Sequence, residues 1–233
     1  MKAKKLFVIF AVILLSIQAI CGQAVWHGFP FTVALHSQSS RCTGSLISRR
    51  AILTISDCLI ESTTLVILGA ADASYTDEST QVRFHVGAET YRHDPNSPLA
   101  IIRFSPQIAF FNNYINQITI PFSTPDALYE DVDATVLGFL EEPVVPDAVY
   151  SWRVRTIQNQ DCTIAHPDIE SEHICVADAL HCIINSGSPL VFLNNSRFEQ
   201  IGIVFRSNRC GGGNNRSIFL RITPFFNFIR ANM

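Results

Sequence analysis

The sequence lacks an excess of basic residues. Its 233 residues include 17 Lys and Arg against 20 Asp and Glu, which gives a formal net charge of −3. Nucleic acids and anionic membranes carry negative charge and would be repelled by an acidic protein surface. We therefore expect no nucleic-acid partner and no charge-driven membrane contact.

After residue 20 the sequence also lacks any apolar run long enough to cross a membrane. The fifteen apolar residues 6–20 follow three lysines and end at small residues near Gly22. A membrane-spanning helix needs roughly 20 apolar residues, whereas this layout is typical of a cleaved secretory signal. We predict a signal peptide at 1–22 and a secreted, extracellular chain at 23–233, and loss of three lysines brings its charge near −6.

Metal-binding cysteine spacing is missing as well. The seven cysteines include no Cys-x-x-Cys pair, and the seven histidines show no ligand spacing. Cys21 leaves with the signal, and the remaining six cysteines indicate disulfides, although six cysteines alone allow about 15 pairings. We expect no metal site and no cofactor.

No internal repeat, low-complexity tract or charged linker divides the rest of the chain. Short segments rich in β-branched and aromatic residues alternate with turn residues instead, which favours a β-barrel or β-sandwich. We expect strands at 32–35, 51–54, 65–68, 81–86, 99–104, 134–139, 152–155, 190–192, 200–205 and 217–222.

One helix is expected, at the C-terminus. Thr223 is a candidate N-cap, Pro224 suits the first helical position, and Phe225, Phe228 and Ile229 would share one face. A Pro-containing stretch at 141–147 is the expected boundary between two halves.

Several segments then resemble one family in the order in which they occur. They are CTGSLI at 42–47, LTISDC at 53–58, LAIIRF at 99–104, VLGF at 136–139, NSGSPL at 185–190, GIV at 202–204 and IRAN at 229–232. Together they resemble the trypsin/chymotrypsin-like serine proteases, from about Gly28 to the C-terminus. The resemblance implies an all-β fold of two six-stranded antiparallel barrels with a short C-terminal helix. It also implies the disulfides Cys42–Cys58, Cys162–Cys175 and Cys182–Cys210.

The catalytic positions depart from that family. Ser186 matches the nucleophile, but Asp57 stands at the position of the base and Pro98 at that of the orienting aspartate. Carboxylates are much weaker bases than imidazoles at neutral pH, and a serine hydroxyl needs a base to attack a peptide. At the oxyanion-hole positions, Ser186 is kept and Ile184 replaces glycine. We predict no functional triad.

The substrate-pocket and activation positions depart as well. Asn185 replaces the aspartate that pairs with a newly cut N-terminal amine, and no Arg/Lys-Ile-Val-Gly-Gly activation site occurs in the sequence. The resemblance places the pocket at Leu180, Phe205, Arg206, Ser207 and Ser217. These residues do not support a trypsin-like preference for basic side chains.

Two Asn-x-Ser sequons predict N-glycosylation at Asn194 and Asn215. The combined pattern predicts a monomeric, secreted serine protease homologue that does not cleave peptides and binds a protein or peptide as a decoy or regulator. One alternative is an active endopeptidase in which Ser186 uses another base, with His173 and His181 as the nearby histidines. Another is a structural component of a secretion.

Overall fold

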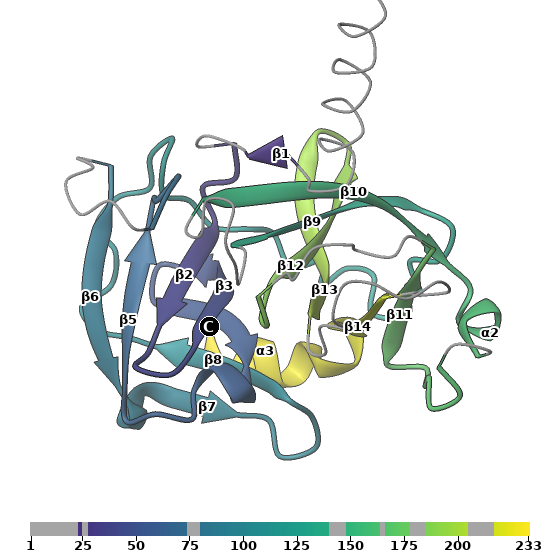
Figure 1. Ribbon diagram of the computed structural model, residues 1–233, viewed down its shortest axis with the longest axis horizontal. Coiled ribbons are helices and arrows are strands. Elements are labelled where there is room, and N and C mark those ends of the chain that lie inside the picture. The colour runs from purple at the N-terminus through teal and green to yellow at the C-terminus, as the bar shows by residue number, and fades with distance from the viewer. Residues whose placement is uncertain are drawn as a thin grey trace, which may run out of the picture.

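Two antiparallel β-sheets make up the protein (Figure 1). The computed structural model describes residues 23–24, 28–73, 80–139, 148–163, 166–177, 185–204 and 217–233. The expected signal peptide at 1–22 lies outside these residues. Among the described residues, no helix has the length and apolar character that a membrane crossing requires.

The N-terminal sheet contains seven strands in the order β6-β5-β2-β3-β4-β8-β7. Their bounds are β2 (Thr32–His36), β3 (Arg41–Ser48), β4 (Ala51–Ile55), β5 (Thr63–Leu68), β6 (Val82–Gly87), β7 (Tyr91–His93) and β8 (Leu99–Arg103). Every residue of β4 is buried, as its continuous apolar sequence requires. Two short 3₁₀ helices, η1 (Ser56–Cys58) and η2 (Ala88–Thr90), connect strands of this sheet.

The C-terminal sheet contains another seven strands, in the order β1-β10-β11-β14-β13-β12-β9. Their bounds are β1 (Gln23–Ala24), β9 (Asp133–Phe139), β10 (Val149–Ile157), β11 (His173–Val176), β12 (Pro189–Asn194), β13 (Arg197–Val204) and β14 (Ser217–Arg221). Because β9 pairs with both β10 and β12, six of these strands form a closed ring and β1 adds to β10 outside it. The predicted chymotrypsin-like fold is confirmed.

The predicted boundary at 141–147 is wrong. Both β9 and β10 belong to the C-terminal sheet, and they pair along seven residues from Val149↔Phe139 to Arg155↔Asp133. The chain therefore passes from one sheet to the other between β8 and β9, at 104–132. The prolines near 143 mark a connection within one sheet rather than between two halves.

The C-terminal helix is present but begins differently from the prediction. A 3₁₀ turn, η3 (Thr223–Phe225), leads into α3 (Phe226–Asn232), and no side chain caps either element. Ile222 occupies the N-cap position and Thr223 is the first residue of η3, so Thr223 does not act as the predicted cap. A second short helix, α2 (Asn159–Cys162), was not predicted.

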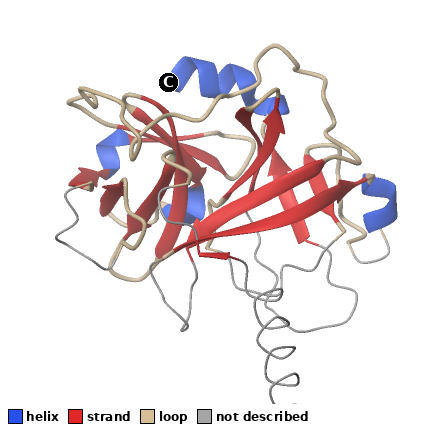
Figure 2. Ribbon diagram, turned by 90° about the horizontal axis from the view of Figure 1, so that it is seen from above, coloured by secondary structure: helices blue, strands red, loops and turns tan. Residues whose placement is uncertain are grey.

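The largest core cluster extends across both sheets. It joins apolar side chains of the N-terminal sheet to Leu137, Val191 and Ile203 of the C-terminal sheet. Phe226 and Ile229 of α3 belong to the same cluster, and Figure 2 shows this helix lying along one side of the molecule. A second cluster lies within the C-terminal sheet, so the two sheets share part of their hydrophobic interior.

Candidate functional site

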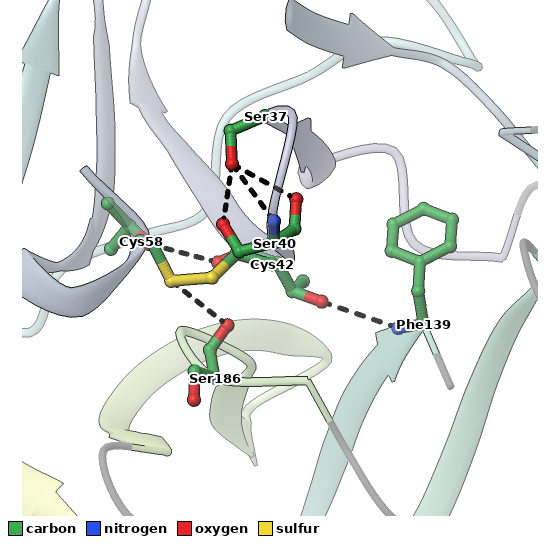
Figure 3. Close-up of a disulfide and its surroundings, with 8 residues drawn as sticks. Ser37, Ser40, Cys42, Cys58, Phe139 and Ser186 are labelled. Carbon is green, nitrogen blue, oxygen red and sulfur yellow. Dashed lines mark hydrogen bonds between the residues drawn. A yellow bond between two sulfur atoms is a disulfide. The ribbon is translucent and has the colours of Figure 1, made fainter. Parts of the chain in front are cut away.

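Ser186 lies where the two sheets meet. It belongs to the turn that precedes β12, and its carbonyl oxygen accepts a hydrogen bond of 2.9 Å from the amide of Thr43 in β3. The Sγ of Cys58 approaches the same oxygen at 3.5 Å (Figure 3). Since a disulfide sulfur has no hydrogen to donate, this is a packing contact. The backbone of Ser186 is thus fixed against the opposite sheet.

The backbone conformation and close packing at position 187 require glycine. Its φ is +82°, and a Cβ there would overlap the carbonyl oxygen of Thr43 and come within 2.5 Å of the Oγ1 of Thr54. Only glycine adopts that backbone without strain and without overlap. The amide of Gly187 donates to the carbonyl of Val204 at 2.8 Å, which ties the turn to β13.

Thr43 connects three segments around this turn. Besides its bond to Ser186, its Oγ1 accepts a hydrogen bond of 3.3 Å from the amide of Phe139 at the end of β9. Its carbonyl oxygen accepts one of 3.0 Å from the Oγ1 of Thr54 in β4. Figure 3 shows the link from this strand to Phe139 beside the disulfide.

The structure brings the three predicted triad positions into one neighbourhood. Asp57 is exposed in η1, one residue before the cysteine whose sulfur contacts Ser186. The carbonyl of Pro98 accepts a hydrogen bond of 2.7 Å from the amide of Ser56, so the segment before β8 lies beside η1. Pro98 has no side-chain acceptor that could orient a base.

The hydroxyl of Ser186 makes no hydrogen bond to any described residue. Its carbonyl accepts the contacts given above, and Figure 3 shows the Oγ on the side away from the disulfide. Asp57 likewise makes none within the described part of the chain. The nucleophile and base of the family mechanism would be hydrogen-bonded to each other, and the described residues contain no such pair at Ser186.

Asn185 is a feature whose surroundings the sequence did not reveal. Its side chain is 1% exposed, and among the described residues neither its Oδ1 nor its Nδ2 has a hydrogen-bond partner. Within the same residues the Oγ of Ser188, which is fully buried, has none either. Two buried polar side chains therefore flank the Ser186–Gly187 pair.

Of the predicted pocket positions, only Ser217 is described. It is half-buried at the first position of β14, paired with Val176 of β11. Four other pocket positions and the oxyanion-hole position lie outside the described residues: Leu180, Phe205, Arg206, Ser207 and Ile184. The shape of the substrate pocket is therefore not part of the described geometry.

Two of the three implied disulfides are present. Cys42–Cys58 joins β3 to η1 across a sequence separation of 16, and Cys162–Cys175 joins α2 to β11 across a separation of 13. Closing loops of this size contributes about 3 kcal/mol each. The implied bond Cys182–Cys210 lies outside the described residues.

The sequon at Asn194 lies at the tip of the β12–β13 hairpin. Asn195 and Ser196 form its two-residue turn with φ values of 46° and 65°. The Nδ2 of Asn194 donates to the Oε1 of Glu199 at 3.3 Å. Asn215 lies outside the described residues, and both glycosylation sites stay predictions.

A buried guanidinium forms a polar cluster in the C-terminal sheet. Arg221 in β14 is 2% exposed and donates to the carbonyl of His173 at 2.7 Å and to the carbonyl of Leu128. Burial lowers the pKa of Arg221, while nearby Glu130 and Tyr129 oppose that effect. These backbone bonds hold a loop in place, so we assign the cluster a structural role.

Comparison with known proteins settles the family. The sequence profile of the trypsin family matches residues 21–229, nearly the whole chain. The chain belongs to the trypsin family. Family membership agrees with the observed fold, and the assignment of Asp57, Pro98 and Ser186 to the triad positions stays a prediction. Within the described residues, no group of three or more His, Cys, Asp or Glu side chains could hold a metal ion.

Its relatives are named as proteases. It is 26% identical over 221 residues to a chicken (Gallus gallus) urokinase-type plasminogen activator, a match that covers 82% of the chain and 50% of the relative. It is 25% identical over 218 residues to chicken trypsin I-P1, covering 88% of the chain and 84% of the relative. A venom protease of Bombus pensylvanicus is 23% identical over 201 residues, covering 79% and 82%. The chain thus spans about half the length of the first relative.

Proposed function

We propose that this trypsin-family protein does not cleave peptides and acts by binding a protein or peptide. The observation that carries the proposal is the exposed carboxylate of Asp57 at the position of the general base, next to a disulfide that packs against Ser186. With aspartate there and proline at position 98, neither group can accept and hold the serine proton as an oriented imidazole would.

The retained features support a binding role equally well. Gly187, Thr43 and the Cys42–Cys58 bond hold the turn of Ser186 between the two sheets. A protein that presents a fixed surface to a partner needs this rigidity as much as an enzyme does. Occupation of an inhibitor or competition with an active protease for its substrate would both use such a surface.

Secretion is part of the proposal. The apolar run at 6–20 has the layout of a signal peptide, and the two disulfides require an oxidising compartment such as the secretory pathway. We propose a monomeric mature chain at 23–233, glycosylated at Asn194 and Asn215.

A hydrolysis assay tests the proposal directly. The purified secreted protein and its Ser186→Ala variant are incubated with a broad peptide library, and cleavage products are measured by mass spectrometry. We expect equal, background-level cleavage, because no described residue is placed to act as a base for the Ser186 hydroxyl. Chicken trypsin, a named relative, serves as the positive control.

Cleavage by the wild-type protein that disappears in Ser186→Ala would contradict the proposal and identify an active endopeptidase with an unusual base. The double variant Asp57→His, Pro98→Asp provides a second readout of the same site. If the wild-type protein is inactive and this variant cleaves peptides, the missing histidine and aspartate side chains, rather than the fold, prevent catalysis.

A further inference from the structure

A cavity of about 530 Å³ opens on the N-terminal sheet. The described residues that line it come from the end of β2 and the following turn, from the connection between η1 and β5, and from β5 and β6. Ser186, Asp57 and Pro98 are not among them. The cavity is therefore separate from the site at which the proposed function is tested.

The floor of the cavity is a row of residues across three strands. His36 of β2 lies opposite Leu65 of β5, and Leu65 lies opposite His85 of β6. Directly opposed residues in antiparallel strands point to the same face of the sheet. Since neighbouring strands are about 4.8 Å apart, the two histidines stand about 10 Å apart with the half-buried leucine between them.

Glu61 forms part of the wall and holds the rim in place. Its carboxylate accepts hydrogen bonds from the amides of Gln38 at 2.9 Å and Ser39 at 2.8 Å, and from the hydroxyl of Ser39. These bonds, the one from the Ser39 hydroxyl foremost, hold the pKa of Glu61 below its ordinary value. Glu61 therefore remains negatively charged at neutral pH.

The disulfide of the neighbouring site stiffens the same walls. One wall continues from the 37–40 turn into Cys42, and the other begins three residues after Cys58. The Cys42–Cys58 disulfide joins the two walls at one end. The hydrogen bonds from the amides of Gln38 and Ser39 to Glu61 join them at the other end. The cavity is consequently preformed and does not need to close around a ligand.

Charge and shape point to a cationic ligand. Among the described residues lining the cavity, Glu61 is the one with a permanent charge, and hydroxyl and imidazole groups make up most of the rest. The methylene groups of a lysine or arginine side chain would pack on Leu65, and the charged end of that side chain would lie among hydrogen-bond acceptors. The net negative charge of the whole chain favours approach of such a ligand.

We propose that this cavity binds the side chain of a lysine or arginine in a partner polypeptide. The stem lies over Leu65, and the ammonium or guanidinium group lies beside Glu61 between the two histidines. This interaction does not depend on Ser186 or on the loss of catalysis.

The two cavity histidines have charged neighbours. The charged groups around them are Arg41 opposite His36, Glu61 on the rim, and Glu89, whose carboxylate lies over Gly87. Arg83 of β6 is engaged by the Oε1 of Gln81 at 2.7 Å and the carbonyl of Ala73 at 2.6 Å.

The test is an NMR titration of the purified full-length secreted protein at pH 7.5. The probe is an acetylated, amidated Gly-Arg-Gly peptide, and the matched control replaces arginine by citrulline, which is uncharged but nearly isosteric. We expect saturable shifts at His36, His85 and Thr63 with the arginine peptide, and at least tenfold weaker binding of the citrulline peptide.

Variants separate the cavity from general charge effects. Glu61→Gln keeps a carbonyl acceptor for the rim and should weaken binding at least fivefold. Asp133→Asn is the matched control, because it also removes one negative charge but lies in the C-terminal sheet. There Asp133 forms an exposed ion pair of 3.0 Å with Arg155, and its replacement should change the affinity for the arginine peptide less than twofold.

Equal affinity for the arginine and citrulline peptides would overturn the proposal, as would tighter binding of a Gly-Glu-Gly peptide. Shifts confined to the turn of Ser186 would also overturn it, since they would place the peptide in the other site. Ser186→Ala should leave arginine-peptide binding unchanged, so this test and the hydrolysis assay can fail independently.

Discussion

At the scale of single residues, the turn around Ser186 combines a tightly fitted backbone with ill-matched side chains. Gly187 occupies a conformation and a space that only glycine fits, whereas the polar side-chain atoms of Asn185 and Ser188 are buried with no hydrogen-bond partner among the described residues. The sequence predicted the turn from its resemblance to the family. It could not predict the unpaired atoms, because their environment is made by residues such as Phe139 that are distant in the chain.

Replacement of Gly187 by alanine should destabilise the protein strongly. The positive φ costs about 1–3 kcal/mol for a residue with a Cβ, and the overlap with the carbonyl of Thr43 adds to it. We expect a loss of at least 2 kcal/mol in the free energy of unfolding, measured by urea denaturation. Ser186→Ala in the same turn is the control and should change it by less than about 0.5 kcal/mol, because its hydroxyl makes no described bond. Equal effects of the two substitutions would contradict this account.

At the scale of secondary-structure elements, alternation and β-branched content predicted ten strands close to their observed positions. Four strands were not among them. β1, β7 and β11 have two to four residues, which are too few to show a period, and β3 entered only as a segment that resembles the family. The helix start was predicted incorrectly because η3 already begins at Thr223, which places Ile222, a residue with no polar side chain, at the N-cap. The division between the halves was misplaced because prolines mark loops without indicating which sheets those loops connect.

Helix α3 should contribute to stability through one face alone. Ile229 is fully buried in the shared core, so Ile229→Ala should cost about 2–5 kcal/mol through lost burial and the cavity left behind. Asn227 lies on the exposed face of the same helix, and Asn227→Ala should change stability by less than about 0.5 kcal/mol. Thermal unfolding followed by circular dichroism measures both, and similar losses in the two variants would contradict the view that one face of α3 carries its contribution.

At the scale of the whole molecule, the shared core implies that the two sheets unfold together. Apolar residues of both sheets and of α3 form one cluster, and Thr43 is bonded to Ser186 and Phe139 in the other half. The sequence predicted two barrels from the family resemblance, but burial across the junction depends on contacts between residues over a hundred positions apart.

We expect one cooperative transition when the protein is denatured with disulfides intact. Native-state hydrogen exchange should give the same opening free energy for the slowest amides of β4 and of β13, since neither sheet can lose the common cluster and stay folded. Two separate free energies differing by more than about 2 kcal/mol would show independently stable halves.

The links made by Thr43 have a consequence for how such a sequence can change over time. Under the proposed function, positions that serve only proton transfer would be free to change once cleavage is no longer selected, and Asp57 and Pro98 would be two such positions. Thr43, Gly187 and the Cys42–Cys58 pair hold the two halves together whether or not a peptide is cut. Lineages that lose the chemistry should therefore keep this joint long after the triad has gone, and a conserved Ser-Gly turn alone is a poor criterion of enzymatic activity.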